Sequence, residues 1–523
     1  MQQVPETKRH ISVRTAAAFV VASMIGTGVF TSLGFQLVEI QAVFPLLMLW
    51  VIGGVVALLG ALTYSELAAA LPRSGGEYHL LSRIIHPALG FVGGLVSATV
   101  GFSAPAVLAA MALGSYLAAV FPNFEPMWVA TLCILFFHLL HGYNLHWGKL
   151  FQDWSTVVKV GLILLFIAAG LMITESQAIS LLPRAGDGQL LRSSGFAVSL
   201  VWVSYAYTGW NSTVYIAGEM LHPQRDIPRS ILVSTIFVMV LYVLLNFVFL
   251  YTTPRTPMVG EIEIGYIAGQ YIFGAAGAKI FAIGISILLV STVSSYVYIG
   301  PRIMQTMGQD YSYISFLSKT NDQGIPVNAF LLQLLICLAF IFSSSFEQVL
   351  LYAGIVLIFT TTITTAAVFV LRYKEPDLPR PYKTWGYPWT PLLFVLVNLW
   401  ILHYTFWEKP LESSIGMGIM ILSLGLYYLG KNYLKAAGKE STTTARQSPF
   451  IFTILIHAIY IKEPHLFITV YGQYYFLNRI WIQFGWCQLA GIGSYRLRTS
   501  LRKDHGHGYS SWRFDSTFCW YNH

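Results

Sequence analysis

The sequence predicts an all-α, polytopic membrane protein. Hydrophobic residues account for 55% of its 523 residues, whereas charged residues account for only 10%. The apolar runs are long enough to cross a bilayer, which takes roughly 20 helical residues. Two of these runs are interrupted by glycine and small polar residues, and matched interruptions of this kind are typical of a transporter's binding site. The expected fold is a bundle of membrane helices in which the first and sixth are broken.

Charged residues and prolines separate the apolar runs in the first half of the chain. Glu39 follows the first run, Arg73 and Arg83 follow the second, and Pro122 and Pro126 lie in the short loop after the third. Because polar loops cannot lie in hydrocarbon, these residues mark the limits of the spans. The predicted spans are near 13–35, 45–71, 88–120, 127–142 and 152–173.

The second half of the chain has the same pattern. Asp226, Arg255, Asp322, Glu375 and Lys409 each lie in a polar segment between two apolar runs. Together with the first half, this gives about twelve spans. The further spans are expected near 194–220, 230–252, 275–299, 326–344, 349–372, 388–406 and 413–430.

The break in the first span, Ser23 to Gly28, has a definite chemical consequence. A half-helix that begins within Gly26-Thr27-Gly28 would leave backbone N–H groups free, and the positive end of its dipole favours an anion such as a carboxylate. The carbonyls of Met24 and Ile25, which end the preceding half-helix, would face a cation. Glycine also occurs where membrane helices pack closely, but that alternative explains a single glycine better than a pair of breaks.

The break in the sixth span, Ser204 to Trp210, provides the other half of the expected site. Gly209 interrupts the helix, and the carbonyls around Tyr205 and Tyr207 could face the same cation. An amino acid zwitterion offers one charged group to each kind of helix end. Tyr207 and Trp210 could instead serve only to pack the span, since aromatic side chains bury large areas anywhere.

The charge distribution predicts the orientation of the chain. The formal net charge is +8, but Lys and Arg concentrate in the terminal segments and the even-numbered loops. The odd-numbered loops contain only Arg184, Arg192, Arg255 and Lys409. This asymmetry places both termini in the cytoplasm of a cell-membrane protein and argues against nucleic acid as a partner. The four cysteines match no metal spacing, and neither a metal nor a cofactor is expected.

Several motifs, in order along residues 10–435, resemble the amino acid-polyamine-organocation superfamily. They are Ser23 to Phe30, Tyr64 to Tyr78, and Ala206-Tyr-Thr-Gly-Trp-Asn211 followed by Glu219-Met220 and Pro223 to Pro228. The last run is similar to the L-type amino acid transporter branch. The resemblance implies a core of two inverted five-helix repeats, followed by two peripheral helices. It also implies alternating access of an amino acid across the membrane.

The same resemblance implies roles for individual residues. Thr27 and Gly28 would bind the substrate carboxylate, and the carbonyls of Met24 and Tyr205 would receive the amine. Tyr205 and Trp210 would close over the substrate or shape the pocket for its side chain.

Lys159 is the other informative residue, because an ionisable group within a membrane span is costly and usually functional. At 1.5 Å per residue, it would lie roughly 10 Å inside the fifth span. Together with Phe151-Gln-Asp153, this lysine resembles a fifth-helix motif of sodium-independent relatives, in which the ammonium occupies the place of a coupling cation. A snorkelling lysine is the alternative, as is a sodium site completed by Thr292, Ser294 and Ser295 of the eighth span.

The chain departs from the family in two places. The loop Phe121 to Pro126 lacks the cysteine through which animal L-type members join a partner, so no disulfide-linked heavy subunit is expected. The family pattern also stops near Ser448, and an out-of-frame or spliced C-terminus remains open. The expected organisation is a cytoplasmic N-terminus (1–12), a transport core (13–372), two peripheral spans (388–430) and a cytoplasmic or atypical tail (431–523), to which no function is assigned.

The sequence thus predicts a secondary amino acid transporter. The expected substrates are neutral amino acids, carried without sodium by exchange or proton-linked uptake. A cationic amino acid or polyamine antiporter is the alternative within the superfamily. A remote alternative is an intramembrane enzyme that uses His138, His141 and His146 of the fourth span.

Overall fold

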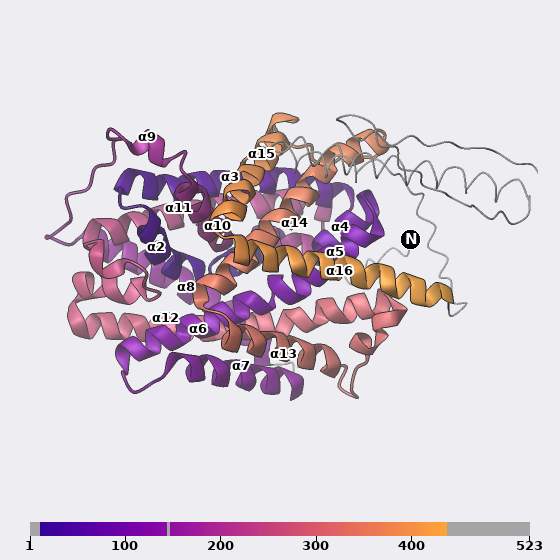
Figure 1. Cartoon of the computed structure of the whole chain (residues 1–523), viewed down its shortest axis with the longest axis horizontal. Coiled ribbons are helices and arrows are strands. Elements are labelled where there is room, and N and C mark those ends of the chain that lie inside the picture. Colours follow the sequence, from indigo (N-terminus) through magenta and orange to yellow (C-terminus); the bar gives the residue numbers. More distant parts are fainter. Residues whose placement is uncertain (1–10, 144–146, 437–523) are drawn as a thin grey trace, which may run out of the picture. The chain divides into compact units, whose positions relative to one another are not determined.

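The computed structural model describes residues 11–143 and 147–436, which form a closely packed bundle of helices (Figure 1). Among these residues there is no strand beyond one parallel bridge between Ile11 and Met220. The first ten residues, His146 and the tail after residue 436 lie outside the described residues.

The helices follow the predicted spans closely. The first half contains α1 Val13–Met24, α2 Gly28–Glu39, α3 Val43–Ala70, α4 Gly76–Ile84, α5 Pro87–Val96, α6 Ser103–Val120, α7 Pro126–Tyr143 and α8 Trp147–Leu171. The second half contains α9 Asp187–Leu190, α10 Ser194–Ala206, α11 Pro223–Thr252, α12 Ile264–Asp310, α13 Val327–Ser343, α14 Phe346–Lys374, α15 Trp389–Glu408 and α16 Pro410–Ala436. A 3₁₀ helix, η3 Ser212–Glu219, follows α10.

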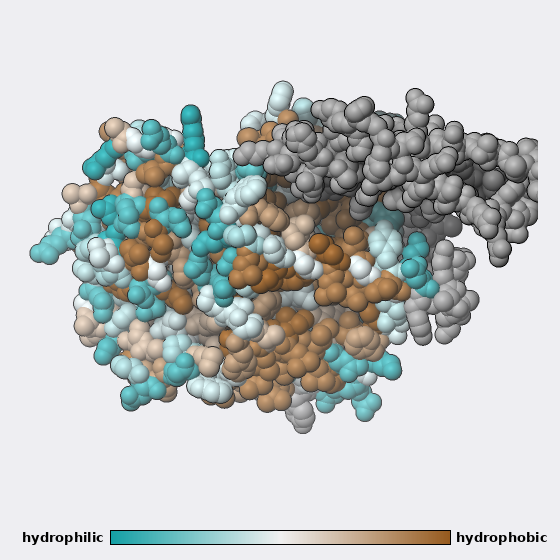
Figure 2. All heavy atoms as spheres, in the orientation of Figure 1, coloured by the Kyte–Doolittle hydropathy of each residue, from teal (hydrophilic) through white to brown (hydrophobic). Residues whose placement is uncertain are grey.

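The length and composition of these helices identify a multi-pass membrane protein. Among the described residues, 8 helical stretches are long and apolar enough to cross a membrane, and there are four shorter apolar helices. Hydrophobic side chains are also exposed on the outside of the bundle, and Figure 2 shows them gathered in a broad area. Leu132 and Leu139 of α7, Leu335 of α13 and Leu429 of α16 are all more than half exposed. A lipid environment explains such a surface, because soluble monomers rarely expose large apolar patches.

Three elements differ from the predicted spans. The helix α12 covers Ile264–Asp310 instead of 275–299, and it contains a kink at Gly274, where φ is 70°. The predicted start at 275 therefore coincides with the kink, and the polar residues after 299 remain helical. The third span is divided by a π-helical segment, Ser97–Gly101, between α5 and α6. The α-helix of the sixth span ends at Ala206, a turn follows over residues 207–211, and a 3₁₀ helix then runs from Ser212 to Glu219.

The packing of the bundle brings the two broken helices together in its interior. The helix α10 packs against α2, and α1 packs against both α11 and η3. At the end of η3 the chain pairs with the segment before α1. The Ile11 N–H donates to the Glu219 carbonyl at 3.0 Å, and the Leu221 N–H donates to the Ile11 carbonyl at 3.0 Å.

Candidate functional site

The first predicted break is present between α1 and α2. The helix α1 ends at Met24, Ile25 has a non-helical ψ of 88°, and α2 begins at Gly28. Thr27 precedes α2 without a side-chain cap for its first N–H groups. The Met24 carbonyl accepts a hydrogen bond of 2.6 Å from the Tyr242 hydroxyl of α11. A carbonyl oxygen has two lone pairs, so one remains for a substrate amine.

The second predicted break, after α10, is a tight turn. Gly209 has a φ of 98°, a conformation that glycine adopts far more readily than other residues. The Tyr205 carbonyl accepts hydrogen bonds from the Thr208 N–H at 3.0 Å and from the Thr208 hydroxyl at 2.7 Å. Both of its lone pairs are therefore used within the turn. Binding of an amine by this carbonyl would require the exchange of one of these bonds.

The two breaks are in direct contact, and glycines make this contact possible. A Cβ atom on Gly28 would lie 2.5 Å from the Cα atom of Ala206. A Cβ atom on Gly209 would lie 2.7 Å from the carbonyl carbon of Ser23. Each break therefore contributes a glycine that lies against the backbone of the other. By contrast, a Cβ atom on Gly26 would meet nothing within 4 Å.

A small cavity lies where the breaks meet, and residues from α1, α2, α10 and α12 line it. The lining residues are Ser23, Met24, Gly26, Thr27, Gly28, Tyr205, Ala206, Thr208, Thr292 and Tyr296. No acidic or basic side chain is among them. Backbone atoms and hydroxyl groups supply the polar surface, which suits a small zwitterion whose charges meet helix ends.

A second cavity lies beside the first, on the other side of the turn after α10. Tyr205 and Thr208 line both cavities, whereas Tyr207 and Trp210 line only the second. The Tyr207 hydroxyl donates to the Trp50 carbonyl at 2.9 Å, which gives this side chain a structural role. The Trp210 ring lies edge-on to Tyr64, with 4.7 Å between the ring centroids. Of the predicted substrate-binding residues, Ile25 and Gly209 line neither cavity, and the others divide between the two.

Lys159 contacts the first cavity through an intermediate residue. The lysine is 5% exposed, and its ammonium donates to the Thr292 hydroxyl at 2.9 Å. The same hydroxyl donates to the Leu288 carbonyl at 3.0 Å. Since Thr292 lines the cavity, one side chain separates the Lys159 charge from the space between the breaks.

Sequence reasoning missed Tyr242 and Tyr296 as residues of the site. Tyr242 holds the Met24 carbonyl, and Tyr296 lines the first cavity. A lone tyrosine within an apolar run gives no signal of what it faces. Only the packing of α11 and α12 against the breaks identifies these two residues.

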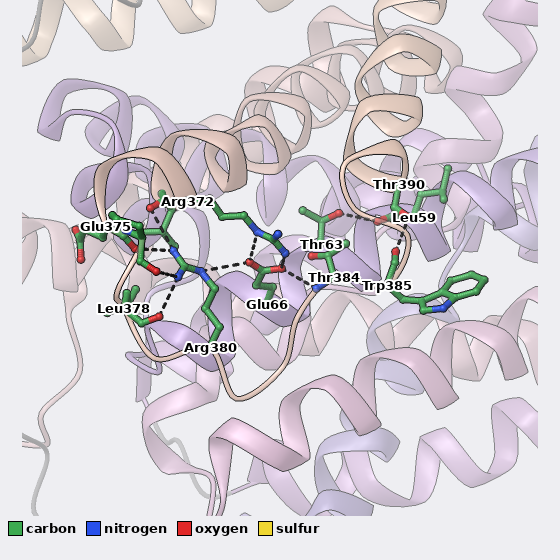
Figure 3. A network of polar contacts seen from close by, with 12 residues as sticks. Leu59, Thr63, Glu66, Arg372, Glu375, Leu378, Arg380, Thr384, Trp385 and Thr390 are labelled. Carbon is green, nitrogen blue, oxygen red and sulfur yellow. Dashed lines mark hydrogen bonds and ion pairs between the residues drawn. The ribbon is translucent and has the colours of Figure 1, made fainter.

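Glu66 lies near the end of α3. It is fully buried, and Arg372 binds both of its oxygens, at 2.8 Å and 2.7 Å. Arg380 lies 3.5 Å from its Oε1 atom, and the Thr384 N–H donates to Oε2 at 2.6 Å. Figure 3 shows how this carboxylate joins α3 to the end of α14 and the loop after it.

The histidines of α7 do not form a metal site. His138 and His141 are both buried, and each makes one hydrogen bond, to the Ile134 carbonyl and to Ser294 respectively. Within 11–143 and 147–436, no group of three His, Cys, Asp or Glu side chains could hold a metal ion.

The fold is that of a multi-pass membrane protein with a small cavity between two broken helices. The chain belongs to the amino acid permease family, whose model matches residues 11–430. It is a transporter and not an enzyme, because that family and the relatives below carry amino acids. The family resemblance inferred from the motifs is thereby confirmed.

Several curated relatives match most of the chain. The large neutral amino acids transporter small subunit 2 of Mus musculus is 24% identical over 476 residues, covering 89% of this chain and 87% of that protein. The b(0,+)-type amino acid transporter 1 of Mus musculus is 22% identical and covers 82% of this chain and 89% of its own length. The Asc-type amino acid transporter 1 of Homo sapiens is 23% identical, over 81% of this chain and 82% of that protein.

Proposed function

We propose that this permease exchanges neutral amino acids across the cell membrane without sodium. The observation that carries this proposal is the cavity between the two breaks, because its lining offers helix ends and hydroxyl groups but no carboxylate. A side chain with an extra positive charge would find no counter-charge there. The similarity to a large neutral amino acids transporter supports the same conclusion.

The proposed architecture has twelve spans, a core at 13–372 made of two inverted five-helix repeats, and peripheral spans at 388–430. The breaks occur in the first helix of each proposed repeat, which is the arrangement that inverted-repeat transporters use for binding. Within this arrangement, α15 and α16 are the peripheral pair. Both termini are assigned to the cytoplasm from the Lys and Arg distribution.

The substrate would bind with its carboxylate at the start of α2, where Thr27 and Gly28 line the cavity. Its amine would face the end of α1, where the Met24 carbonyl keeps a free lone pair and the Ile25 carbonyl is adjacent. Tyr205 would separate the bound backbone from the second cavity, since it lines both spaces. Tyr207, Gly209 and Trp210 then act by shaping the turn after α10.

A ligand screen tests this assignment. A ligand that binds only the folded state raises its apparent stability, so neutral amino acids should raise the melting temperature of the purified protein. Counterflow of a labelled neutral amino acid into proteoliposomes should follow the same order of ligands. If cationic amino acids or polyamines alone stabilise the protein, the cationic antiporter would replace this proposal. The similarity of this chain to a b(0,+)-type amino acid transporter makes the cationic antiporter the alternative to test.

Lys159 is proposed to take the place of a coupling sodium ion. Its ammonium binds Thr292, which is one of the hydroxyl groups that a sodium ion would need. We expect Lys159→Ala to lower exchange about tenfold or more, because the site would lose a buried charge next to a cavity-lining hydroxyl. The measurement is counterflow with and without sodium in otherwise identical buffers.

A control variant separates this role from general damage to α8. Gly161 lies two residues away, and a Cβ atom there would meet nothing within 4 Å. Gly161→Ala should therefore transport at the wild-type rate. Unchanged exchange in Lys159→Ala, or a strict need for sodium in the wild type, would contradict the proposed role of the lysine.

We also propose that this chain works without a disulfide-linked heavy subunit. The loop between α6 and α7 contains no cysteine, whereas Cys133 lies within α7 and Cys337 is buried in α13. Electrophoresis of membranes with and without reductant gives the test. A larger species that reductant converts to the monomer would contradict the proposal.

A further inference from the structure

Glu77 is a buried carboxyl group that the site described above does not use. It lies in the first turn of α4, which is not one of the candidate membrane spans, and it is 2% exposed. Gly75 and Gly76 precede it with φ values of 127° and 57°. A Cβ atom on Gly76 would lie 2.3 Å from the ring of Tyr215. This glycine pair makes the sharp turn that places the carboxyl group inside the protein.

Both hydrogen-bond donors of Glu77 connect it to the break after α10. Asn211, at the end of that break, donates to the Glu77 Oε1 atom at 3.1 Å. The Tyr64 hydroxyl donates to the same oxygen at 2.9 Å. The Tyr64 ring in turn packs against Trp210. Any movement of the turn from Gly209 to Asn211 therefore acts directly on the surroundings of this carboxyl group.

No positive charge balances Glu77 among the described residues. The titratable groups that face it are Tyr64 of α3 and Tyr215 of η3. The cations on the packed elements have other partners: Arg372 binds Glu66, Lys374 donates to the Ile84 carbonyl, and Arg83 of α4 itself binds Glu375. The other titratable groups on or next to these elements are Arg73, Tyr78 and His79 at α4, His86 before α5, Glu347, Tyr352 and Tyr373 of α14, and the exposed Glu219 of η3. Glu347 pairs with Lys409.

Burial therefore decides the protonation of this group. It raises the pKa of the Glu77 carboxyl to about 7, although the hydrogen bonds from Tyr64 and Asn211 act in the opposite direction. A solvated glutamate has a pKa of about 4.3. The arrangement in which Glu77 is buried is called the packed arrangement, and one in which water reaches Glu77 is called the hydrated arrangement. The carboxyl group thus binds a proton more tightly in the packed arrangement than in the hydrated one. Between those two pKa values, a rise of one pH unit favours the hydrated arrangement by up to about tenfold, and the effect levels off above pH 7.

We propose that Glu77 is a proton-binding site whose occupancy is linked to the rearrangement of the broken sixth helix. The packed arrangement holds the proton, and opening of the protein around α4 releases it to the solution on that side. This proposal rests on the amino acid exchange proposed above, and it adds a proton site separate from Lys159. On the proposed topology, this site faces the cytoplasm.

The variant Glu77→Gln tests the link, because it fixes the side chain in a neutral form and keeps an Oε1 atom to accept both hydrogen bonds. Exchange of a labelled neutral amino acid would be measured with equal pH on both sides, from about pH 5 to 8. We expect the wild-type rate to change several-fold up to about pH 7 and then to level off. Glu77→Gln should show a flat profile at the wild-type low-pH rate. Glu219→Gln, which removes an exposed carboxylate nearby, should keep the wild-type profile.

Infrared spectroscopy of the purified protein provides a second measurement that does not depend on transport. The carbonyl band of a protonated carboxylic acid should titrate near pH 7 in the wild type and in Glu219→Gln, and it should be missing in Glu77→Gln. A pH profile of exchange that Glu77→Gln leaves unchanged would overturn the link to transport, and absence of the band from the wild type would overturn the proton site. If the wild type exchanges no amino acid at any pH, the proposed function fails, and the band still decides whether Glu77 binds a proton.

Discussion

Substitution of Gly28 by alanine should almost abolish amino acid exchange. The added Cβ atom would lie 2.5 Å from the Cα atom and 2.7 Å from the Cβ atom of Ala206. Real Cβ atoms do not approach other atoms so closely, and the obstacle here is largely backbone, so α2 and α10 must separate. Overpacking of this kind costs about 1 to 3 kcal/mol. Because the proposed substrate cavity lies at this contact, we expect exchange to fall about tenfold or more.

A neighbouring glycine provides the matched control. Gly26 lies in the same break and lines the same cavity, but a Cβ atom there has open space. Gly26→Ala should therefore fold with wild-type thermal stability, and its effect should be confined to substrate affinity. Counterflow in proteoliposomes and the melting temperature of each variant check both expectations. Equal transport by Gly28→Ala and the wild type would contradict the close contact of the two breaks.

Removal of the Glu66 carboxylate should give the largest loss of stability. Glu66→Ala would remove the counter-charge of Arg380, which is 8% exposed, and would leave the buried Thr384 N–H without its acceptor. Loss of one partner from a buried ion pair costs about 3 to 5 kcal/mol, because the remaining charge stays buried. Arg372 is 24% exposed and can be partly rehydrated, so the lower end of that range applies.

Thermal unfolding in detergent measures this loss. We expect a clear fall in the melting temperature of Glu66→Ala and none in Glu219→Gln, whose exposed carboxylate makes no ion pair in the described part of the chain. The melting temperature of Glu66→Gln should be intermediate, since this substitution keeps an oxygen acceptor but loses the charge. A melting temperature unchanged in all three variants would show that the network in Figure 3 adds little to stability.

The positions of the helices and of both breaks could be predicted from sequence because they depend on local signals. Long apolar runs identify the spans, and Gly28 and Gly209 mark the two interruptions, since α2 begins at Gly28 and Gly209 lies in the turn after α10. The kink at Gly274 could not be predicted, because a single glycine in an apolar run is equally compatible with a straight helix. The π-helical segment Ser97–Gly101 likewise has no distinguishing composition.

The partners of the site residues could not be predicted, because they come from distant parts of the chain. Tyr242 lies 218 positions from Met24, whose carbonyl it binds. Glu66 and Arg372 are separated by 306 positions, so either could equally have been an interfacial charge. The sequence places Glu77 only within the motif Tyr64 to Tyr78, since burial of its carboxyl depends on how α3 and η3 enclose α4.

The short bridge at Ile11 has a consequence for how movement in this protein could be followed. The hydrogen bonds that join Ile11 to Glu219 and Leu221 fasten the beginning of the first broken helix to the end of the second. Two spectroscopic labels placed beside this bridge, one on each of the two paired segments, should keep a constant separation throughout the transport cycle. The distance between a label on either paired segment and a label on α14 should instead change as the two joined segments move relative to the rest of the bundle.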